Sequence, residues 1–428
     1  MAKKKNGKSI KVVLAYSGGL DTTVAIKWLQ DNYDAEVIAA CVDVGQAEDL
    51  KGHAARAESA GAIKTYVIDA TAEYANDYIV PALKANVLYE GVYPAGTALA
   101  RHLICQKLVE IARKEGATHL AHGCTAKGND QVRFESSFAV LAPDLKVIAP
   151  MREWHVSREE EIEYLKAHGM KVPVKVGSPY STDENLWGRS VECGVLEDPW
   201  VEPPADAYEW TKSLSEAPSE PQNMIIAFEK GVPISIDGKA MSPLEIVSKL
   251  NQIAGAHGIG RIDHIENRVV GIKSREIYEY PAAVVLIKAH QALEKHVHMK
   301  DLSAFKTLVE QKIAEMVYGG LWFTPLMKAL LAFIESTQEV VTGEVHLKLF
   351  KSSATVIGTR SPLSLYKMNL STYGASDGFN HEAAQGFLEL YTLPLKVQSV
   401  QASQVEGTNG ISPEMLVQMN TKIKTQAH

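Results

Sequence analysis

The stretch that decides the fold runs from Val12 to Gln30 and reads VVLAYSGGLDTTVAIKWLQ. Its first part is an unbroken apolar run, which predicts a buried strand, and its last part repeats apolar residues at helical spacing. Ser17, Gly18 and Gly19 stand between the two. Because glycine has no Cβ atom, such a turn can adopt positive φ and its backbone can approach a ligand closely. The stretch therefore predicts a strand, a tight glycine turn and a helix.

The chemistry of this turn favours an anionic ligand. A turn between a strand and a helix points backbone N–H groups outward, and the helix dipole adds partial positive charge. The hydroxyls of Ser17, Thr22 and Thr23 are further donors. A purely structural turn would not need two adjacent glycines and these hydroxyls, so we interpret the turn as a phosphate or pyrophosphate site.

Two commoner nucleotide motifs are excluded. A Walker A loop needs Lys after its last glycine, but Asn129 follows Gly128. The segment GIGRID, residues 258–263, has Asp where the dinucleotide fingerprint has its last glycine. The turn after Tyr16 is therefore the one candidate phosphate motif in the sequence.

Strand and helix patterns alternate through the first third of the chain. Apolar runs at residues 36–45, 65–69, 118–123 and 146–151 predict strands, and Thr97–Gly116 predicts a long helix that ends at a glycine. Repeated units of this kind predict an α/β fold with a doubly wound parallel sheet.

The pattern changes near Lys175. Proline-rich turns are followed by mixed strand and helix patterns, which predict a second domain of α+β type. We expect a nucleotide-binding domain at 1–174, a second domain at 175–399 and a C-terminal tail at 400–428. In the tail, Ser412 and Pro413 predict the start of a short helix, which would need a packing partner to be stable.

Composition limits the class of protein. The 428 residues are 46% hydrophobic with a net charge of −7, which is typical of a soluble globular protein and argues against a nucleic-acid partner. Cys41, Cys105, Cys124 and Cys193 form no C-x-x-C pair, so neither a zinc ribbon nor a redox pair is predicted, and a cytoplasmic location fits best. We expect no secretory signal, because the basic N-terminal stretch MAKKKNGKSIK has no apolar run, and no membrane partner, because Gly319, Gly320, Pro325 and Lys328 interrupt the apolar segment 316–334.

Several motifs carry a resemblance to a known family. AYSGGLDTT, residues 15–23, resembles the pyrophosphate-binding loop of the N-type ATP pyrophosphatases. Four further segments resemble the argininosuccinate synthases of that superfamily and occur in the same order: HGCTAKGNDQVRFE (122–135), STDENLWGRS (181–190), GIGRIDHIENRVVGIKSREIYE (258–279) and SPLSLY (361–366).

The resemblance implies a reaction. Members of the family are ligases that join citrulline to aspartate with ATP, and they release AMP and pyrophosphate in arginine biosynthesis. The ureido oxygen of citrulline attacks the α-phosphorus to form citrullyl-AMP, and the aspartate amine then displaces AMP. The resemblance also implies Mg²⁺ with the ATP, a synthetase and multimerisation role for the second domain, an oligomerisation role for the tail, and a homotetramer. No carboxylate pair in the sequence identifies ligands for the metal.

The resemblance also implies site residues, and it assigns catalytic roles to Asp21, Asp130 and Arg133. The ATP-binding positions are Ala15, Tyr16, Ser17, Gly18, Gly19, Leu20, Asp21, Thr22, Thr23, Val42 and Gly123. The aspartate-binding positions are Thr125, Asn129 and Asp130. The citrulline-binding positions are Tyr93, Ala98, Asn129, Arg133, Ser181, Ser190, Glu266 and Tyr278.

Some of these assignments agree with chemistry, and some positions depart from the family pattern. Arg133 can hold a carboxylate with two hydrogen bonds, and Asp130 can accept from an ammonium group. Ala98 stands where the family often has Ser, so Thr97 or the backbone would take its place. His102 stands where the family often has Pro, and we interpret it as a packing residue on the predicted helix.

Two other functions are compatible with the glycine turn. A tRNA-modifying relative usually requires catalytic cysteines or a basic extension, which the cysteine spacing and net charge disfavour. A non-catalytic ATP sensor would not need Thr125, Asn129, Asp130, Arg133 and Glu266 together.

Overall fold

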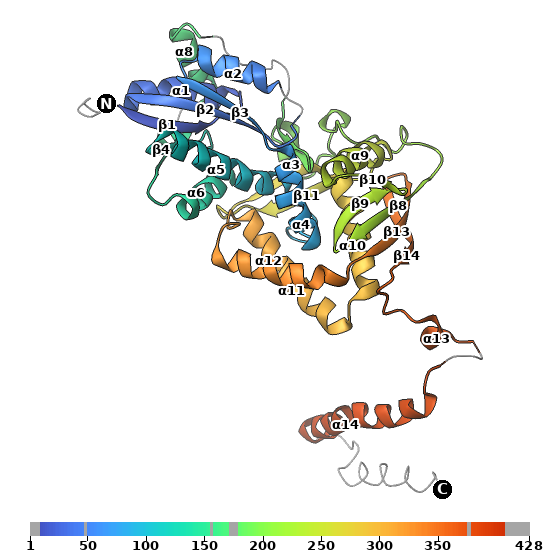
Figure 1. Cartoon of the computed structure of the whole chain (residues 1–428). Coiled ribbons are helices and arrows are strands. Elements are labelled where there is room, and N and C mark those ends of the chain that lie inside the picture. Colours follow the sequence, from blue (N-terminus) through green and yellow to red (C-terminus); the bar gives the residue numbers. More distant parts are fainter. Residues whose placement is uncertain (1–8, 47–48, 155–156, 171–178, 375–377, 407–428) are drawn as a thin grey trace, which may run out of the picture. The chain divides into compact units, whose positions relative to one another are not determined.

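The computed structural model describes residues 9–46, 49–154, 157–170, 179–374 and 378–406. The chain divides into two compact units, Met1–Leu365 and Tyr366–His428. The first unit contains three sheets and most of the helices (Figure 1). In the described part of the second unit there are two helices, α13 (Met368–Ser371) and α14 (His381–Glu406). The predicted helix at Ser412 and Pro413 lies outside the described residues.

The first part of the chain forms a parallel five-stranded sheet in the order β3-β2-β1-β4-β5. Its strands are β1 (Ile10–Ala15), β2 (Ala35–Asp43), β3 (Lys64–Asp69), β4 (His119–Ala121) and β5 (Lys146–Ile148). Its helices are α1 (Leu20–Tyr33), α2 (Leu50–Ser59), α3 (Thr71–Glu73), η1 (Tyr74–Ile79), α4 (Val80–Lys84), α5 (Gly96–Glu115), α6 (Asp130–Leu141), α7 (Pro150–Trp154) and α8 (Arg158–Ala167).

Both faces of this sheet are covered by helices. Successive side chains of a strand point to opposite faces, and here the side chains on both faces are apolar. Val12 and Leu14 of β1 pack in one cluster with residues of α1 and α2. Val13, between them, packs in another cluster with residues of α5 and α6. Figure 1 shows the two helix layers on opposite sides of the sheet. The predicted doubly wound parallel fold is confirmed.

The remainder of the first unit is built on two antiparallel sheets, with the orders β11-β12-β7-β6 and β10-β9-β8-β13-β14. Their strands are β6 (Ser181–Asn185), β7 (Gly188–Glu192), β8 (Gln222–Glu229), β9 (Val232–Ile236), β10 (Lys239–Ala240), β11 (Arg261–Asn267), β12 (Lys273–Glu279), β13 (Gly343–Phe350) and β14 (Ser353–Arg360). The helical segments are η2 (Gly194–Glu197), η3 (Ala205–Ala207), α9 (Pro243–Ala256), α10 (Pro281–Val297), α11 (Lys300–Tyr318), α12 (Pro325–Thr337) and η4 (Gln338–Val340).

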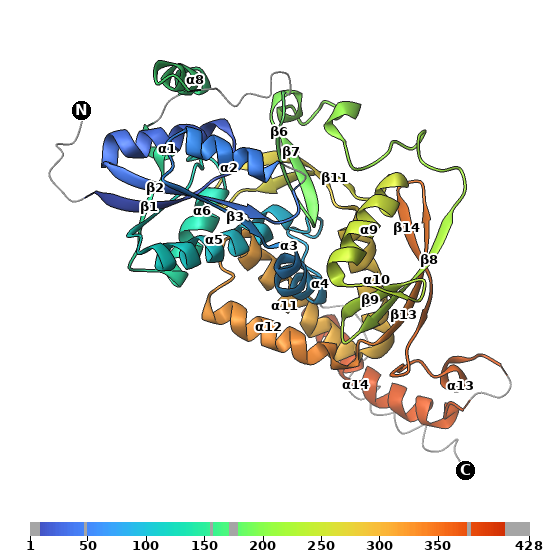
Figure 2. The same cartoon turned by 45° about the horizontal axis from the view of Figure 1, so that its top comes forward.

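Helices α9 and α10 pack against the five-stranded antiparallel sheet, as Figure 2 shows. The predicted α+β character of this region is confirmed. The largest apolar cluster joins it to residues of η1, α4 and α5. The glycine turn and the antiparallel sheets therefore belong to one packed unit.

The apolar segment 316–334 is two helices rather than one. Helix α11 ends at Tyr318, and α12 begins at Pro325 with Thr324 as its N-cap. The glycine pair and the proline thus end one helix and begin the next, as the sequence predicts. None of the helices in the described part of the chain has the length and apolarity to span a membrane.

Candidate active site

The glycine turn lies at the switch point of the parallel sheet. Strand β1 is central in the order, with β2 on one side and β4 on the other. Ligands of open α/β sheets bind where neighbouring strands send their connections in opposite directions. The loop after β4 reaches the same place, because a Cβ atom added to Gly123 would lie 2.8 Å from Cγ2 of Thr22. The structure therefore brings the predicted Gly123 against the predicted turn.

Helix α2 packs against the buried side of the turn and holds it in place. Gly18 has φ +77°, and a Cβ atom there would lie 2.4 Å from the ring of His53. The Arg56 guanidinium donates to the carbonyl oxygen of Gly18. Only glycine fits this close approach, while Ser17 and Gly19 on the outer side of the turn are exposed.

Hydroxyl groups hold the first turn of α1. The Thr23 hydroxyl donates to the Gly19 carbonyl oxygen at 2.7 Å, and it lies 2.9 Å from the Tyr16 hydroxyl. The Ser17 and Thr22 hydroxyls are 3.2 Å apart. Thr23 thus supports the turn rather than facing outward, and Ser17 is the exposed hydroxyl.

Most of the other side chains predicted to bind ATP are packed inside the protein. Leu20 is buried against α8 and α7, and Val42 is buried near the end of β2. Ala15 is half-buried at the end of β1. Their contribution to a nucleotide site would therefore come largely from the backbone.

Asp21 has a carboxyl neighbour that the sequence did not reveal. Glu161 of α8 is buried, and burial together with the hydrogen bond and negative charge of Asp21 raises the pKa of Glu161 to about 8. Glu161 is consequently protonated at neutral pH.

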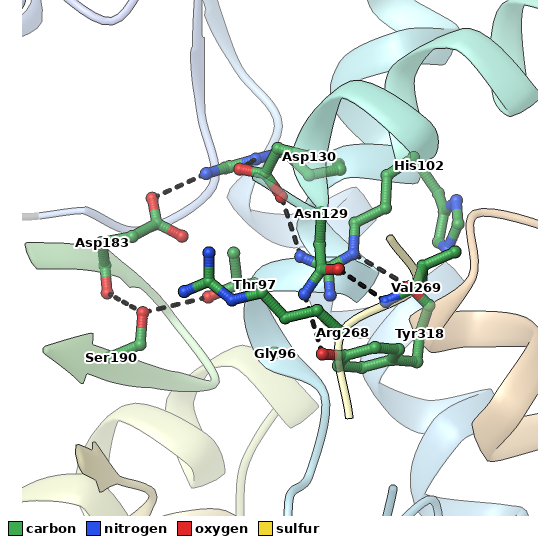
Figure 3. Close-up of polar contacts among 12 residues, drawn as sticks. Gly96, Thr97, His102, Asn129, Asp130, Asp183, Ser190, Arg268, Val269 and Tyr318 are labelled. Carbon is green, nitrogen blue, oxygen red and sulfur yellow. Dashed lines mark hydrogen bonds and ion pairs between the residues drawn. The ribbon is translucent and has the colours of Figure 1, made fainter. Parts of the chain in front are cut away.

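The second group of polar side chains surrounds Asp130, the first residue of α6 (Figure 3). One oxygen of Asp130 accepts from Arg133 Nη1 at 2.8 Å, and the other accepts from Arg101 Nε at 2.9 Å. Burial would raise the pKa of Asp130, but the two positive charges hold it at about 2. Arg133 also donates to the Tyr318 carbonyl oxygen at 3.0 Å, and its guanidinium lies over the Tyr318 ring.

Asn129 connects this group to the β11–β12 hairpin. Its Oδ1 accepts from the backbone N–H of Val269 at 2.9 Å, and its Nδ2 donates to the Tyr318 hydroxyl at 2.7 Å. Arg268, before Val269, is bonded to Glu192, Glu276 and Ser274. The hairpin turn therefore fixes the orientation of the Asn129 amide.

Glu266 lies at the centre of a set of tyrosines. Its carboxylate is buried and accepts from Tyr278 Oη at 2.5 Å and from the Tyr318 hydroxyl. Tyr278 stacks on Tyr93 with a centroid distance of 4.0 Å, and Tyr89 stacks on Tyr318 at 3.6 Å. The structure thus brings together the predicted Tyr93, Asn129, Glu266 and Tyr278.

The other predicted citrulline positions differ in their surroundings. The Ser190 hydroxyl is 3.4 Å from the Thr97 hydroxyl, whereas Ala98 is fully buried in the apolar core. Thr97, the alternative for Ala98, is therefore the residue of this pair that reaches the polar group. Thr125 and Ser181 are exposed, in the loop before Asn129 and at the start of β6.

His102 is a packing residue, as its place in the sequence indicates. It is fully buried between Ser137 and the Val317 carbonyl oxygen, and burial lowers the pKa of His102 to about 3. Its ring is therefore neutral and stacks on Trp322.

Comparison with protein-family models decides the family. Residues 11–171 match the model of the arginosuccinate synthase N-terminal HUP domain, and residues 180–398 match that of the arginosuccinate synthase C-terminal domain. The chain belongs to the argininosuccinate synthase family.

Curated relatives agree. The argininosuccinate synthase of Geobacillus thermodenitrificans is 58% identical over 395 residues, which cover 92% of this chain and 97% of the relative. Those of Oceanobacillus iheyensis and Bacillus cereus are each 57% identical, over 91% and 92% of this chain and 93% and 99% of the relatives. The family and the enzyme class, a ligase that forms a C–N bond, are confirmed as predicted.

Three residues of the polar group are missing from the residues predicted for this argininosuccinate synthase site: Arg101, Asp183 and Tyr318. Arg101 comes three residues after the predicted position Ala98 on α5, and Asp183 lies inside the segment STDENLWGRS. Both are therefore close in sequence to predicted site residues, which could have pointed to them. Tyr318 ends α11, far along the sequence, and only the fold brings it to Asn129.

Proposed function

We propose that this member of the argininosuccinate synthase family ligates citrulline to aspartate with ATP through citrullyl-AMP. One observation supports the proposal above all. The glycine turn and the polar group around Asp130 lie at one edge of the sheet, joined by the loop from Gly123 to Asn129. A single site can thus hold a triphosphate beside two amino acids.

The first step needs a cradle for the pyrophosphate that leaves. The exposed backbone of Gly19, the hydroxyl of Ser17 and the start of α1 would bind it, with partial positive charge from the helix. Catalysis would come mainly from placing the ureido oxygen in line with the α-phosphorus. Glu161, beside Asp21, is protonated at neutral pH and so adds no negative charge close to the phosphates.

Mg²⁺ would accompany ATP and neutralise its phosphate oxygens. Over the described ranges, no three His, Cys, Asp or Glu side chains are grouped so that they could hold a metal ion. We infer that the ion would take most of its ligands from phosphates and water.

The second step needs an amine held near the activated carbon. Thr125, Asn129 and Asp130 would hold aspartate, with Asp130 ionised at every physiological pH. The residues that would hold citrulline are Tyr93, Asn129, Arg133, Ser181, Ser190, Glu266 and Tyr278, with Thr97 in place of the buried Ala98. Glu266 would accept from the citrulline ammonium, and the two tyrosines that now donate to it would keep its charge in place.

Water must be kept from the adenylate, since hydrolysis would waste ATP. The β11–β12 hairpin turn lies over the loop before α6, because Val269 donates to Asn129 and Arg268 donates to the Lys127 carbonyl oxygen at 3.4 Å. Within the part of the chain built on the antiparallel sheets, this hairpin is the segment that would cover the two amino acids.

The test of the reaction is product formation with the substrates supplied singly and together. We expect AMP and pyrophosphate to form at a sustained rate only when citrulline and aspartate are both present with ATP. Turnover that needs neither amino acid, or that needs RNA, would contradict the proposal.

The proposed enzyme is a cytoplasmic homotetramer whose C-terminal tail takes part in assembly. Helix α14 has exposed Phe387, Leu388, Leu390, Tyr391 and Leu395 within its own unit, and apolar residues in such number favour a packing partner. Deletion of the residues after Ser399 should lower the mass measured by sedimentation. A truncated chain that sediments with unchanged mass would rule out this role for the tail.

A further inference from the structure

Arg101 joins two parts of the site. It lies in the second turn of α5, where its Nε donates to Asp130 at 2.9 Å and its Nη2 lies 3.0 Å from Oδ1 of Asp183. Asp130 begins α6, and Asp183 belongs to β6 of the antiparallel sheet. The guanidinium is planar and rigid, so it fixes the two carboxylates relative to each other.

The two carboxylates are not equivalent. Both oxygens of Asp130 accept from arginines, Arg101 and Arg133. Only one oxygen of Asp183 does so. Its Oδ2 is shielded from solvent and has no hydrogen-bond partner within the described part of the chain. An unpartnered buried carboxylate oxygen is unfavourable, so such an atom requires an explanation.

Asp183 lies between the two groups of predicted substrate residues. Its backbone carbonyl oxygen accepts from Ser190 Oγ at 3.4 Å, and Ser190 in turn contacts Thr97. Its carboxylate reaches Asp130 through Arg101. One Asp183 oxygen pairs with Arg101, and Figure 3 shows no dashed line at the other oxygen. About a third of the Asp183 side chain is exposed (34%), although its Oδ2 atom is itself shielded.

We propose that Oδ2 of Asp183 accepts a hydrogen bond from an N–H group of an amino-acid substrate, and that Arg101 is the positioning residue that aims it. The inference rests on the proposed ligase function. The ureido N–H groups of citrulline and the ammonium group of aspartate share this chemistry. Asp183 stands where the two substrates must meet, and the substrate N–H supplies the partner that the protein does not.

The sharpest test is Asp183→Asn, which keeps the shape of the side chain. The amide has one acceptor and one donor end. If its oxygen stays on Arg101, its NH₂ faces the substrate N–H; if it turns over, its NH₂ faces the guanidinium. Either orientation places a donor against a donor. We expect KM for one amino acid to rise at least tenfold, with KM for ATP within a factor of two.

The KM values for the two amino acids show which substrate supplies the N–H group. A rise confined to citrulline identifies the ureido group, and a rise confined to aspartate identifies the ammonium group. Arg101→Lys keeps the charge but loses the rigid fork, and it should raise KM for the same amino acid. Unchanged KM values for both amino acids in Asp183→Asn, including the case where only kcat falls, would overturn the inference.

Two further variants complete the test: one is a control, and the other replaces Asp183→Asn if that variant does not fold. Asp144→Asn is the matched control, since Asp144 also pairs with an arginine, Arg113, but on exposed surface. It should leave all three KM values unchanged. If Asp183→Asn does not fold, Asp183→Glu keeps both acceptors and should raise the KM of one amino acid less than tenfold; unchanged KM values there would equally overturn the inference. Product formation by the unsubstituted enzyme tests the proposed function separately.

Discussion

The glycine turn and the group around Asp130 lie at the same edge of the parallel sheet, but they are organised in opposite ways. The turn is fixed by backbone geometry and by contacts behind it, and its outward groups are exposed. The Asp130 group is fixed by its own side chains, most of which bond to one another. A substrate can therefore add to the turn, whereas at most positions of the Asp130 group it must replace contacts that already exist.

The two parts should therefore tolerate different substitutions. The turn depends on glycines that have no Cβ atom, so adding a methyl group there should disable it. The Asp130 group depends on balanced charges, so removing a charge should disable it while its shape is kept. The following predictions test that division, beginning with the largest effect.

Gly18→Ala should have the largest effect. The added Cβ would lie 2.4 Å from the His53 ring, and the residue has φ +77°. The turn must shift, and a misplacement of about 1 Å costs roughly 100-fold in rate. We expect kcat/KM for ATP to fall about 100- to 1000-fold in steady-state assays.

Gly116→Ala is the control for Gly18→Ala. Gly116 has φ +62° at the end of α5, but an added Cβ would meet nothing within 4 Å. It shares the backbone strain without the clash, so it should cost only about 1 kcal/mol of stability. Equal losses of activity in the two variants would show that strain, and not the close approach of α2, explains the result.

Asp130→Ala should come next. It leaves Arg101 and Arg133 with an uncompensated charge and removes the predicted acceptor for aspartate. We expect KM for aspartate to rise about 10- to 100-fold, since a hydrogen bond to a charged group contributes about 1.5–3 kcal/mol. Calorimetric titration should show nearly unchanged ATP binding. Loss of ATP binding with an unchanged KM for aspartate would reverse the division between the two parts.

Glu161→Gln should change stability more than activity, and more at high pH than at low pH. The pKa of Glu161 is about 8 in the folded chain against 4.5 ordinarily. The folded state therefore holds a proton that the unfolded state releases, and stability falls as pH rises from about 4.5 to 8. Gln has no proton to lose. The variant should melt about 2–4 °C above the unsubstituted chain at pH 9, with a smaller difference at pH 5; a constant difference would contradict the raised pKa.

Ala98→Ser should have the smallest effect. Ala98 is fully buried in the core of α5, where a serine hydroxyl can bond to the preceding turn of the helix. We expect KM for citrulline to change less than twofold. Thr97→Val, which removes the hydroxyl beside Ser190, should raise that KM about three- to tenfold. A larger effect at Ala98 than at Thr97 would return the assignment to Ala98.

The two parts also differ in how much of them the sequence could predict. The strand, the turn and the helix around Gly18 and Gly19 were predicted because they are adjacent in the chain, while phosphate binding by the turn stays a prediction. The contacts of Asp130 with Arg101 and of Asn129 with Tyr318 join different helices, and no local pattern encodes such pairs. The support of the turn by His53 and Arg56 was missed for the same reason, since α2 reaches Gly18 only through the fold.

The helices that begin at this edge of the sheet include α1 beside the glycine turn, α5 beside Ser190 and α6 at Asp130. ATP and both amino acids carry carboxylate or phosphate groups, although the chain as a whole has a net charge of −7. Attraction toward the site must therefore be short-ranged, arising from backbone amides and a few arginines rather than from the overall field. Because charges more than about 10 Å apart are screened at 0.1 M salt, substrate capture should be only weakly sensitive to ionic strength.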